Sequence, residues 1–232
     1  MKIGILQCGH FMPEVAERHG DYTALYSRLL AGQGFDFQTW SVVDMEFPLD
    51  VHAADGWLLS GSKHGAYEDL PFIKPLEDFI RRAYKARVPM VGICFGHQIM
   101  AQALGGKVAK FEGGWAIGRQ SYDFDGLGTV ALNAWHQDQI IEPPPGARVI
   151  ARNDFCAYPA LAYEGPALSV QPHPEFDNPT LADLVRFRRG APGYSEEIMD
   201  RAEAGTAQPV DNEALARMIG DFFRNSQGAD HG

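Results

Sequence analysis

The sequence predicts an α/β protein built around a mostly parallel β-sheet with helices on both faces. Short, almost wholly apolar segments alternate with amphipathic ones in the first part of the chain, and such strands are typical of a sheet buried on both sides. The chain has 232 residues, of which 45% are hydrophobic and 22% are charged, so it can bury a sizeable core. A direct strand-to-helix junction near residue 94 agrees with this class, because parallel strands need crossover helices.

The first part of the chain supplies the parallel strands and their helices. Strands are predicted where apolar or alternating segments are bounded by turn residues, and helices where apolar residues recur at helical spacing. In chain order these are a strand at 2–8, a helix at 21–34, strands at 35–40 and 56–61, a helix at 72–87, a strand at 88–93 and a helix at 95–104. Gly105 and Gly106 are expected to end the last helix, because glycine readily terminates helices.

The middle of the chain predicts smaller sheet additions, some of them antiparallel. Between Lys107 and Val170 the strand-like pieces are short and closely spaced. They lie at 117–124, 128–132, 148–152, 155–163 and 167–170, with the proline-rich EPPPGAR, residues 142–148, as a rigid connection. From about 179 to 225 the pattern is mostly helical, and either packing against the sheet or forming a dimer face would explain this segment.

The charge and the apolar segments exclude several classes of partner. The formal net charge is −10, and an acidic surface repels phosphate backbones, so nucleic acid is not an expected partner. The basic runs at 81–82 and 186–189 fall in helical patterns and are predicted to be solvated helix faces. No apolar segment is long enough to span a membrane, and the N-terminus does not resemble a secretory signal. Three well-separated cysteines do not suggest a disulfide framework, which favours a cytoplasmic location.

The stretch Gly92-x-Cys94-x-Gly96 is the strongest chemical signal in the sequence. A strand that runs directly into a helix must turn sharply, and a glycine on each side of the turning residue relieves crowding, as in nucleophile elbows. Cys94 would then stand at a helix N-terminus, whose positive end favours a thiolate. The alternative is that Cys94 is a small hydrophobic residue that fills a tight turn. Cys8 and Cys156 lack this setting and are predicted to be structural.

The same turn also provides a candidate oxyanion donor. Backbone N–H groups of the first helical turn point toward the group that the sulfur attacks, so the N–H of Phe95 is well placed by the predicted structure. Removal of one such donor from an enzyme typically costs roughly a hundred- to a thousandfold in rate.

The candidate general base is His173, in the segment QPHPEF. It follows the strand predicted at 167–170, and Pro172 and Pro174 hold it in an extended conformation. Residues two apart in an extended chain point to the same side, so Glu175 can reach the imidazole nitrogen that faces away from the thiol. Active sites of parallel sheets lie beyond the carboxyl ends of the strands, which favours this reading. A rigid surface loop that exposes both side chains is the alternative.

Two other histidines compete for the role of base. His97 lies one turn after Cys94 on the same predicted helix, and His136 lies in WHQDQ, residues 135–139. Neither has a carboxylate two residues away on an extended segment, so each is a weaker candidate than His173. His136 is expected to form part of a pocket wall.

Three segments taken together resemble the class I, triad-type glutamine amidotransferases. GICFGHQIMAQALGGKV, residues 92–108, resembles the family's nucleophile motif. QPHPEF, residues 171–176, resembles its His-x-Glu signature, and GWLLSGS, residues 56–62, resembles its oxyanion strand. The segments follow the family's order, and the resemblance covers roughly residues 1–190. It implies a three-layer, flavodoxin-like sheet with a smaller antiparallel addition, in one domain over residues 1–232 that includes the C-terminal helices.

The resemblance implies a Cys-His-Glu amidohydrolase. Cys94 would attack the side-chain amide carbon of glutamine, His173 would protonate the departing nitrogen, and Glu175 would orient His173. Water would then hydrolyse the γ-glutamyl thioester. This chemistry needs neither a metal ion nor an organic cofactor.

The resemblance also implies residues that surround the substrate. The N–H groups of Gly61 and Phe95 would hold the oxyanion, and Gln98 matches the family's glutamine-contacting residue. Trp135 and His136 are similar to the segment that helps to hold the amino-acid end of the substrate.

The chain departs from the best-known family members, in which this domain is fused to or paired with a synthetase that consumes the ammonia. It has no P-loop-like glycine motif. GSKHGAYED, residues 61–69, and WHQDQ look most like the stand-alone branch, which resembles GMP-synthetase-type glutaminase domains and includes γ-glutamyl peptidases. The expected substrate is a small molecule, either glutamine, a γ-glutamyl peptide or a γ-glutamyl amine. A synthetase in trans and a homo-oligomer are both open as partners.

Two other functions compete with this reading. A cysteine-dependent α/β-hydrolase of another kind normally places its acid before the histidine, whereas Glu175 follows His173. A catalytically silent binding or regulatory subunit could keep the fold, but it would not need to retain the three residues.

Overall fold

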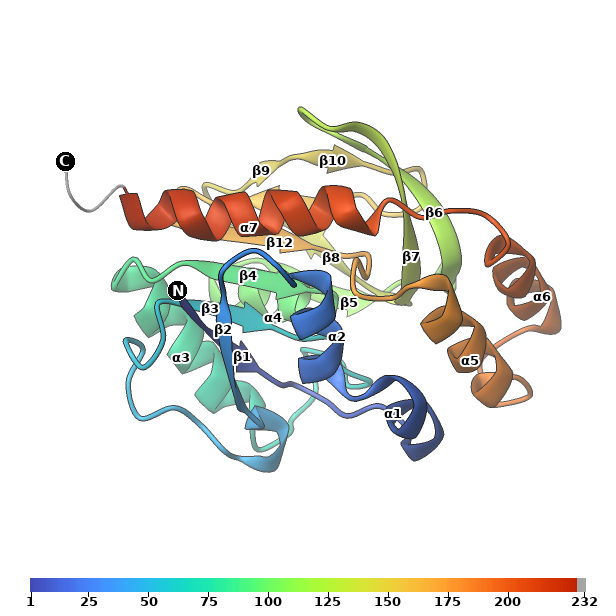
Figure 1. The fold of residues 1–232 in the computed structure, drawn as a ribbon, viewed down its shortest axis with the longest axis horizontal. Helices are drawn as coiled ribbons and strands as arrows, with labels where there is room; N and C mark the ends of the chain where they lie inside the picture. The colour runs from blue at the N-terminus through green and yellow to red at the C-terminus, as the bar shows by residue number, and fades with distance from the viewer. Residues whose placement is uncertain (229–232) are drawn as a thin grey trace.

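The computed structural model describes residues 1–228, and its largest sheet has seven strands in the order β2-β1-β3-β4-β12-β11-β9 (Figure 1). The first five strands of this order run parallel, and β11 is antiparallel to both of its neighbours. The strands are β2 (Asp36–Trp40), β1 (Lys2–Leu6), β3 (Gly56–Leu59), β4 (Met90–Ile93), β12 (Ala167–Val170), β11 (Ala160–Ala162) and β9 (Arg148–Val149). The prediction of a mostly parallel sheet is confirmed.

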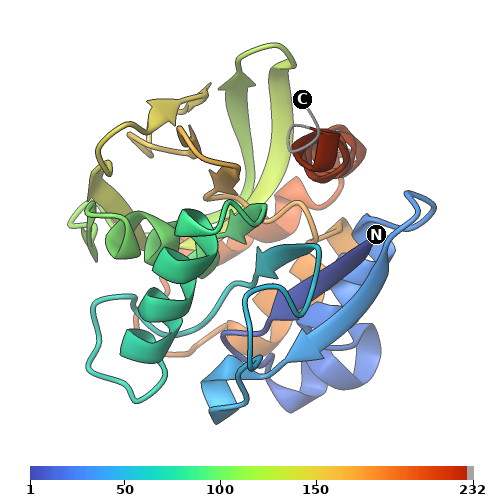
Figure 2. The same cartoon turned by 90° about the vertical axis from the view of Figure 1, so that its left-hand side faces the viewer.

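Helices cover both faces of this sheet, as the sequence predicts. α3 (Ile73–Lys85) and α4 (Phe95–Ala103) bury their apolar sides in one hydrophobic cluster on one face. α2 (Tyr22–Leu29) and α7 (Asn212–Gly228) belong to a second cluster on the opposite face, so the sheet is the middle of three layers (Figure 2).

Two smaller antiparallel sheets are added to this framework. β6 (Ala116–Phe124) and β7 (Gly128–His136) form a hairpin, and β10 (Ala151–Arg152) pairs with the other edge of β6. β5 (Lys107–Lys110) pairs with β8 (Asp138–Glu142). The predicted antiparallel addition is confirmed, but the sequence pattern does not reveal β5 and β8, which are short and carry charged residues at both ends.

Two strand predictions in the middle of the chain are wrong in extent. Residues 148–152 do not form one strand, because β9 joins the main sheet and β10 joins β6, with the buried Ile150 between them. Of residues 155–163, only β11 is a strand. The side chain of Asn153 accepts the first backbone N–H groups of this segment in a turn, and Pro159 has no N–H to give to a strand pairing.

The C-terminal segment consists of α5 (Asn178–Arg188), α6 (Glu196–Gly205) and α7. Leu215, Ile219 and Phe223 recur at helical spacing along α7 and are fully buried against the sheet. Packing against the sheet therefore accounts for α7.

The helices α5 and α6 lie together at one end of the molecule (Figure 1). They share a small hydrophobic cluster with β6, formed by Ile117, Leu181, Val185, Ile198, Met199 and Ala202. The short helix α1 (Pro13–His19), which the sequence pattern does not predict, packs against α5. Arg189 departs from the prediction of a solvated helix face, because it binds the carboxylates of α6 residues Glu196, Asp200 and Glu203.

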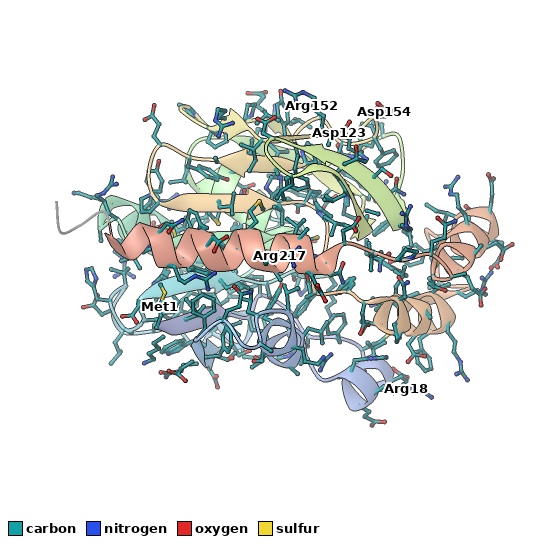
Figure 3. All side chains as sticks on the ribbon, turned by 45° about the horizontal axis from the view of Figure 1, so that its top comes forward. Met1, Arg18, Asp123, Arg152, Asp154 and Arg217 are labelled. Atoms are coloured by element: carbon teal, nitrogen blue, oxygen red, sulfur yellow. The ribbon has the colours of Figure 1, made fainter. Side chains whose placement is uncertain are left out.

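Charged side chains occupy the outer surface. Arg217 lies on the exposed side of α7, and Asp123 and Arg152 lie at the outer edge of the β6–β10 pair (Figure 3). Arg81 is about half exposed and pairs with Asp78 of its own helix, as expected for a solvated helix face. Within residues 1–228, no helix has the length and apolar character needed to cross a membrane.

Candidate active site

Cys94 occupies the turn between β4 and α4. Its backbone has φ 53° and ψ −103°, a conformation that residues with a side chain rarely adopt. A Cβ atom at Gly92 would lie 2.5 Å from the carbonyl oxygen of Gly96, and one at Gly96 would lie 2.3 Å from that of Leu59. Both flanking positions therefore require glycine. The strand-turn-helix geometry predicted for this segment is present.

His173 and Glu175 form a buried pair close to Cys94. The Nδ1 atom of His173 lies 2.7 Å from Oε1 of Glu175, and the side chains are only 3% and 0% exposed. Cys94 and His173 line the same cavity, and Sγ of Cys94 lies 4.0 Å from the carbonyl oxygen of Trp135. The predicted alternative, an exposed loop, is wrong because both side chains are buried.

Backbone and aromatic contacts hold this pair in place. The N–H of His173 donates to the carbonyl oxygen of Asn133 on β7 at 2.9 Å, and the imidazole stacks on the ring of Phe176 at 4.0 Å. The hydroxyl of Tyr26 on α2 donates to Oε1 of Glu175 at 3.2 Å. Since contacts come from both β7 and α2, the orientation of the imidazole depends on two separate parts of the fold.

The surroundings of His173 favour its protonated form. Burial by itself lowers the pKa of this imidazole, but the charges of the Cys94 thiolate and the Glu175 carboxylate, and their hydrogen bonds, outweigh burial and raise the pKa to about 10. The imidazolium is therefore the favoured form of His173 at neutral pH.

The two competing histidines have different surroundings. His97 is fully buried, with Nδ1 at 2.7 Å from Oγ of Ser169 and Nε2 at 3.0 Å from the carbonyl oxygen of Tyr158, and burial lowers its pKa to about 3. His136 lines the same cavity as Cys94. Burial, followed by the charge of His173, lowers the pKa of His136 to about 3 as well. Both rings are neutral at physiological pH, and His97 is held in the core away from the thiol.

The other two cysteines are buried in apolar surroundings. Burial raises the pKa of both the Cys8 and the Cys156 thiols to about 12, so neither forms a thiolate at neutral pH. This agrees with the prediction that both are structural.

Neither of the residues that carry the two predicted oxyanion donors, Gly61 and Phe95, lines the cavity that Cys94 and His173 line. Phe95 is the first residue of α4 and follows Cys94 directly. Gly61 follows β3, and a Cβ atom added there would lie 2.8 Å from the Tyr22 hydroxyl and 2.9 Å from Cε1 of His173. The next residue, Ser62, lines the cavity, whereas Gly61 does not.

The predicted substrate-contacting residues all reach one cavity of about 520 Å³, which Cys94 and His173 also line. Gln98 is buried, and its Nε2 donates to the carbonyl oxygen of Asp138 at 2.8 Å and to the Gln171 side chain at 3.1 Å. Trp135 and His136 line this cavity too, and among residues 1–228 neither ring nitrogen of His136 has a hydrogen-bond partner.

Three residues near the triad have no clear signal in the sequence. Tyr22 and Tyr26 are spaced one turn apart on α2 and look like ordinary core positions, yet Tyr22 lines the cavity and Tyr26 binds Glu175. Asn133 sits inside a β-strand pattern and supports His173 through its backbone. Within residues 1–228, the His, Cys, Asp and Glu side chains form no group suited to holding a metal ion.

Comparison with known families identifies the chain. The profile described as "Glutamine amidotransferase class-I" matches residues 21–187. "Gamma-glutamyl peptidase 2" of Arabidopsis thaliana is 29% identical over 224 residues, which cover 90% of each chain. "GMP synthase [glutamine-hydrolyzing]" of Thermus thermophilus is 32% identical over 173 residues, or 67% of this chain and 32% of that protein.

A solved structure has the same fold. The crystal structure of a glutamine amido transferase from Methylobacillus flagellatus superposes with a TM-score of 0.76 and 21% identity, over 97% of this chain and 94% of that one. With the family profile matching most of the sequence around the elbow and the His-x-Glu segment, the chain belongs to the class I glutamine amidotransferase family.

Proposed function

We propose that this chain is a Cys-His-Glu amidohydrolase that cleaves the γ-glutamyl amide bond of glutamine or of a related γ-glutamyl compound. The buried His173–Glu175 pair, with 2.7 Å between Nδ1 and Oε1, carries the proposal because it adjoins Cys94 in its unusual backbone conformation. A structural cysteine needs neither feature. Membership of the family supports the choice of an amide substrate.

In the first half of the reaction, the Cys94 thiolate attacks the side-chain amide carbon, and the carbonyl oxygen takes up the negative charge. The tetrahedral intermediate then breaks its C–N bond, and His173 donates its proton to the leaving nitrogen. The raised pKa of His173 keeps that proton available at neutral pH. Glu175 holds the ring by its Nδ1 atom throughout, so the proton is delivered from Nε2.

In the second half, water attacks the γ-glutamyl thioester. The now neutral His173 takes a proton from the water, the bond from Sγ to carbon breaks, and glutamate leaves. The proton returns to the Cys94–His173 pair, so the enzyme is regenerated and the sum is amide plus water giving glutamate plus amine.

The oxyanion is held by the N–H of Phe95 together with an N–H from the turn after β3. Gly61 was the sequence-based candidate for the second donor, and Ser62 is the alternative because it lines the cavity. Gln98 uses its Nε2 inside the protein, which leaves its carbonyl oxygen for the ammonium group of the substrate. The backbone at Trp135 and the neutral ring of His136 would hold the amino-acid end of the substrate.

A γ-glutamyl peptide or conjugate is the second candidate substrate. The relatives named γ-glutamyl peptidases align with this chain over most of their length, unlike GMP synthase. Transfer of ammonia to a synthetase supplied in trans is the corresponding role if glutamine is the substrate.

The direct test compares the wild type with Cys94→Ser, offering each glutamine and a γ-glutamyl dipeptide and measuring free glutamate. We expect the wild type to release glutamate from at least one of them and the variant from neither. Labelling with 6-diazo-5-oxonorleucine should modify Cys94 and leave Cys8 and Cys156 intact, with Cys8→Ser as the control. Glutamate release or labelling that survives in Cys94→Ser would sink the proposal, and no turnover in the wild type would favour a silent binding subunit.

A further inference from the structure

The cavity continues beyond the reacting thiol to an aromatic wall. Tyr194, in the loop between α5 and α6, packs with its ring centroid 4.8 Å from that of Trp115 and 5.6 Å from that of Trp135. All three side chains line the cavity and are only partly buried. Aromatic rings that face a cavity in this way offer a flat apolar surface for stacking.

This wall lies beside the reacting groups. The backbone of Trp135 touches the thiol, with its carbonyl oxygen 4.0 Å from Sγ of Cys94. His173, which protonates the leaving nitrogen in the proposed mechanism, stacks on Phe176, and the chain then runs directly into α5. The last residue of α5, Arg188, lines the cavity together with Tyr194.

Arg188 brings a positive charge to this wall. Within the part of the chain that the structure describes, Arg188 forms no ion pair and no side-chain hydrogen bond. The adjacent Arg189 differs, since it binds the carboxylates of Glu196, Asp200 and Glu203. A guanidinium without a partner that lines a cavity suits a carboxylate ligand, which it can bind with two parallel hydrogen bonds.

A second group of cavity residues has a different character. Gln98, Asp138, Tyr67 and Lys110 line it, and Tyr67 donates to the Asp138 carboxylate at 3.1 Å. Polar and charged groups of both signs suit the ammonium and carboxylate of a glutamyl unit. The aromatic wall and Arg188 are then left for the other part of the substrate.

We propose that the leaving amine of the substrate carries both an aromatic ring and a carboxylate, as in a γ-glutamyl dipeptide that ends in an aromatic amino acid. The inference rests on the proposed γ-glutamyl amide hydrolysis. The amide C–N bond breaks, His173 supplies the proton, and the aromatic amino acid leaves as a free amine, while water converts the thioester to glutamate. The aromatic ring of the leaving amine stacks on the aromatic wall of Trp115, Trp135 and Tyr194. The carboxylate of the leaving amine pairs with Arg188.

The cavity also fits this substrate better than the smaller or oppositely charged ones. Ammonia as the leaving group would make no use of the aromatic wall. A polyamine would bring a positive charge to Arg188, where like charges repel. The volume of about 520 Å³ falls in the range of roughly 300–1,000 Å³ that holds drug-sized ligands, so there is room for a dipeptide.

The test uses three amides that separate the two features of the leaving group. γ-Glutamylphenylalanine has the ring and the carboxylate, γ-glutamylalanine has only the carboxylate, and γ-glutamylphenethylamide has only the ring. For the wild type we expect kcat/KM to be highest for γ-glutamylphenylalanine, by at least about tenfold over γ-glutamylalanine. Equal kcat/KM for these two dipeptides, with both cleaved through Cys94, would overturn the proposal while leaving γ-glutamyl hydrolysis intact.

Variants assign each preference to its residue. Tyr194→Ala should remove most of the preference for the ring, whereas Tyr194→Phe keeps the ring and should retain it. Arg188→Gln should lower the ratio of kcat/KM for γ-glutamylphenylalanine to that for γ-glutamylphenethylamide about three- to tenfold. Arg186→Gln is the matched control, because Arg186 lies on the same helix but does not line the cavity. A ratio that changes equally in Arg188→Gln and Arg186→Gln would contradict the role of Arg188.

A binding measurement covers the case in which nothing is cleaved. In Cys94→Ala, binding of γ-glutamylphenylalanine should change the tryptophan fluorescence through Trp115 and Trp135. We expect its Kd to be at least about tenfold below that of γ-glutamylalanine. Such binding without turnover would keep the ligand class and reject hydrolysis. The absence of both turnover and binding would reject the inference together with the proposed function.

Discussion

The backbone of Cys94 is the most constrained position in the site. Its φ of 53° is unfavourable for a residue with a side chain, and strain of this kind costs about 1–3 kcal/mol. Two hydrogen bonds hold the turn: the N–H of Cys94 donates to Val170 on β12 at 2.9 Å, and the N–H of Gly96 donates to Ser60 after β3 at 3.0 Å. Hydrogen bonds to the neighbouring strands therefore hold Cys94 in a backbone conformation that is unfavourable for a cysteine.

This strain predicts an inverted order of stability at position 94. A protein with glycine in place of alanine normally has a free energy of unfolding that is lower by about 0.5–1 kcal/mol. Only glycine, however, adopts the backbone conformation of position 94 without strain. Cys94→Gly should therefore be more stable than Cys94→Ala by about 1 kcal/mol, as measured by urea unfolding. Cys8→Gly and Cys8→Ala are the control variants. Because Cys8 has no positive φ, its alanine variant should be the more stable of the two. If Cys94→Ala were more stable than Cys94→Gly, the turn would not be strained.

A second prediction concerns the pH dependence set by Glu175. His173 has its pKa raised to about 10, so its proton is present at neutral pH and lost as the pH rises through that value. In Glu175→Gln the carboxylate charge is absent, so the alkaline limb of kcat/KM should move to lower pH and kcat should fall about a hundredfold. Glu197→Gln, on the exposed side of α6, is the control and should keep the wild-type profile. An unchanged alkaline limb in Glu175→Gln would rule out this role of the carboxylate.

At this scale the sequence brings forward the three residues that the structure places together, but not the contacts that support them. Cys94 and the His173–Glu175 pair are signalled by local patterns, since a turn between glycines and a histidine between prolines are readable within a few residues. The contacts of Tyr26 and Asn133 with this pair join α2 and β7 to a loop far away in the chain, and no local pattern records such a contact.

The junction of β4 and α4 is the element on which the site is built. α4 lies so close to β3 that a Cβ atom added at Gly96 would clash with the carbonyl group of Leu59. A Cβ atom added at Gly92 would clash with the backbone of Gly96 and with the sulfur of Met100. This close approach brings the positive end of α4 beneath Cys94. A larger residue at either glycine would push the helix away from the strand and shift the sulfur with it.

Gly96→Ala should therefore impair both folding and activity. The added Cβ would lie 2.3 Å from the Leu59 carbonyl oxygen, which is backbone and cannot move aside, so we expect a loss of about 1–3 kcal/mol in unfolding free energy. Gly205→Ala is the matched control, because its nearest neighbour, Cβ of Arg119, is at 3.5 Å and the position is helical. Urea denaturation of both variants tests the difference. Equal stability of the two variants would mean that α4 can shift without cost.

The elements that the sequence predicts correctly are those with strong internal patterns. β3 and β4 are apolar throughout and α3 has a clear apolar stripe, so all three are recognisable in isolation. The division of residues 148–152 between two sheets depends on which neighbours β9 and β10 find, which is a tertiary property. Local propensity carries no information on it.

Across the whole molecule, the C-terminal helix completes the core that the N-terminal strands begin. α7 lies beside α2 and β7 over the same face of the sheet (Figure 2). The ring of Phe223 fills the space above Gly56, where a Cβ would come within 3.0 Å. No residue of α7 within 212–226 lines the cavity of Cys94 and His173.

This arrangement predicts that stability and activity can be separated at Phe223. Phe223→Ala removes a fully buried ring and should lower the free energy of unfolding by about 3–5 kcal/mol. Phe222→Ala removes a partly buried ring of the same size and should cost clearly less. Under conditions where both variants remain folded, kcat should match the wild type. A large fall in kcat for folded Phe223→Ala would show that α7 also shapes the site.

The β6–β7 hairpin contacts His173 and Cys94 at one end only. Asn133 and Trp135 lie near the end of β7 beside His173 and Cys94, whereas the turn at 125–127 is exposed at the far end of the hairpin. For protein engineering, the two ends of the hairpin therefore differ: the turn should tolerate an inserted peptide, and the end of β7 should not. A reporter peptide inserted after Gly126 extends into solvent and leaves the register of the hairpin intact. An insertion of an odd number of residues near Asn133 would turn every following side chain of β7 to the wrong face.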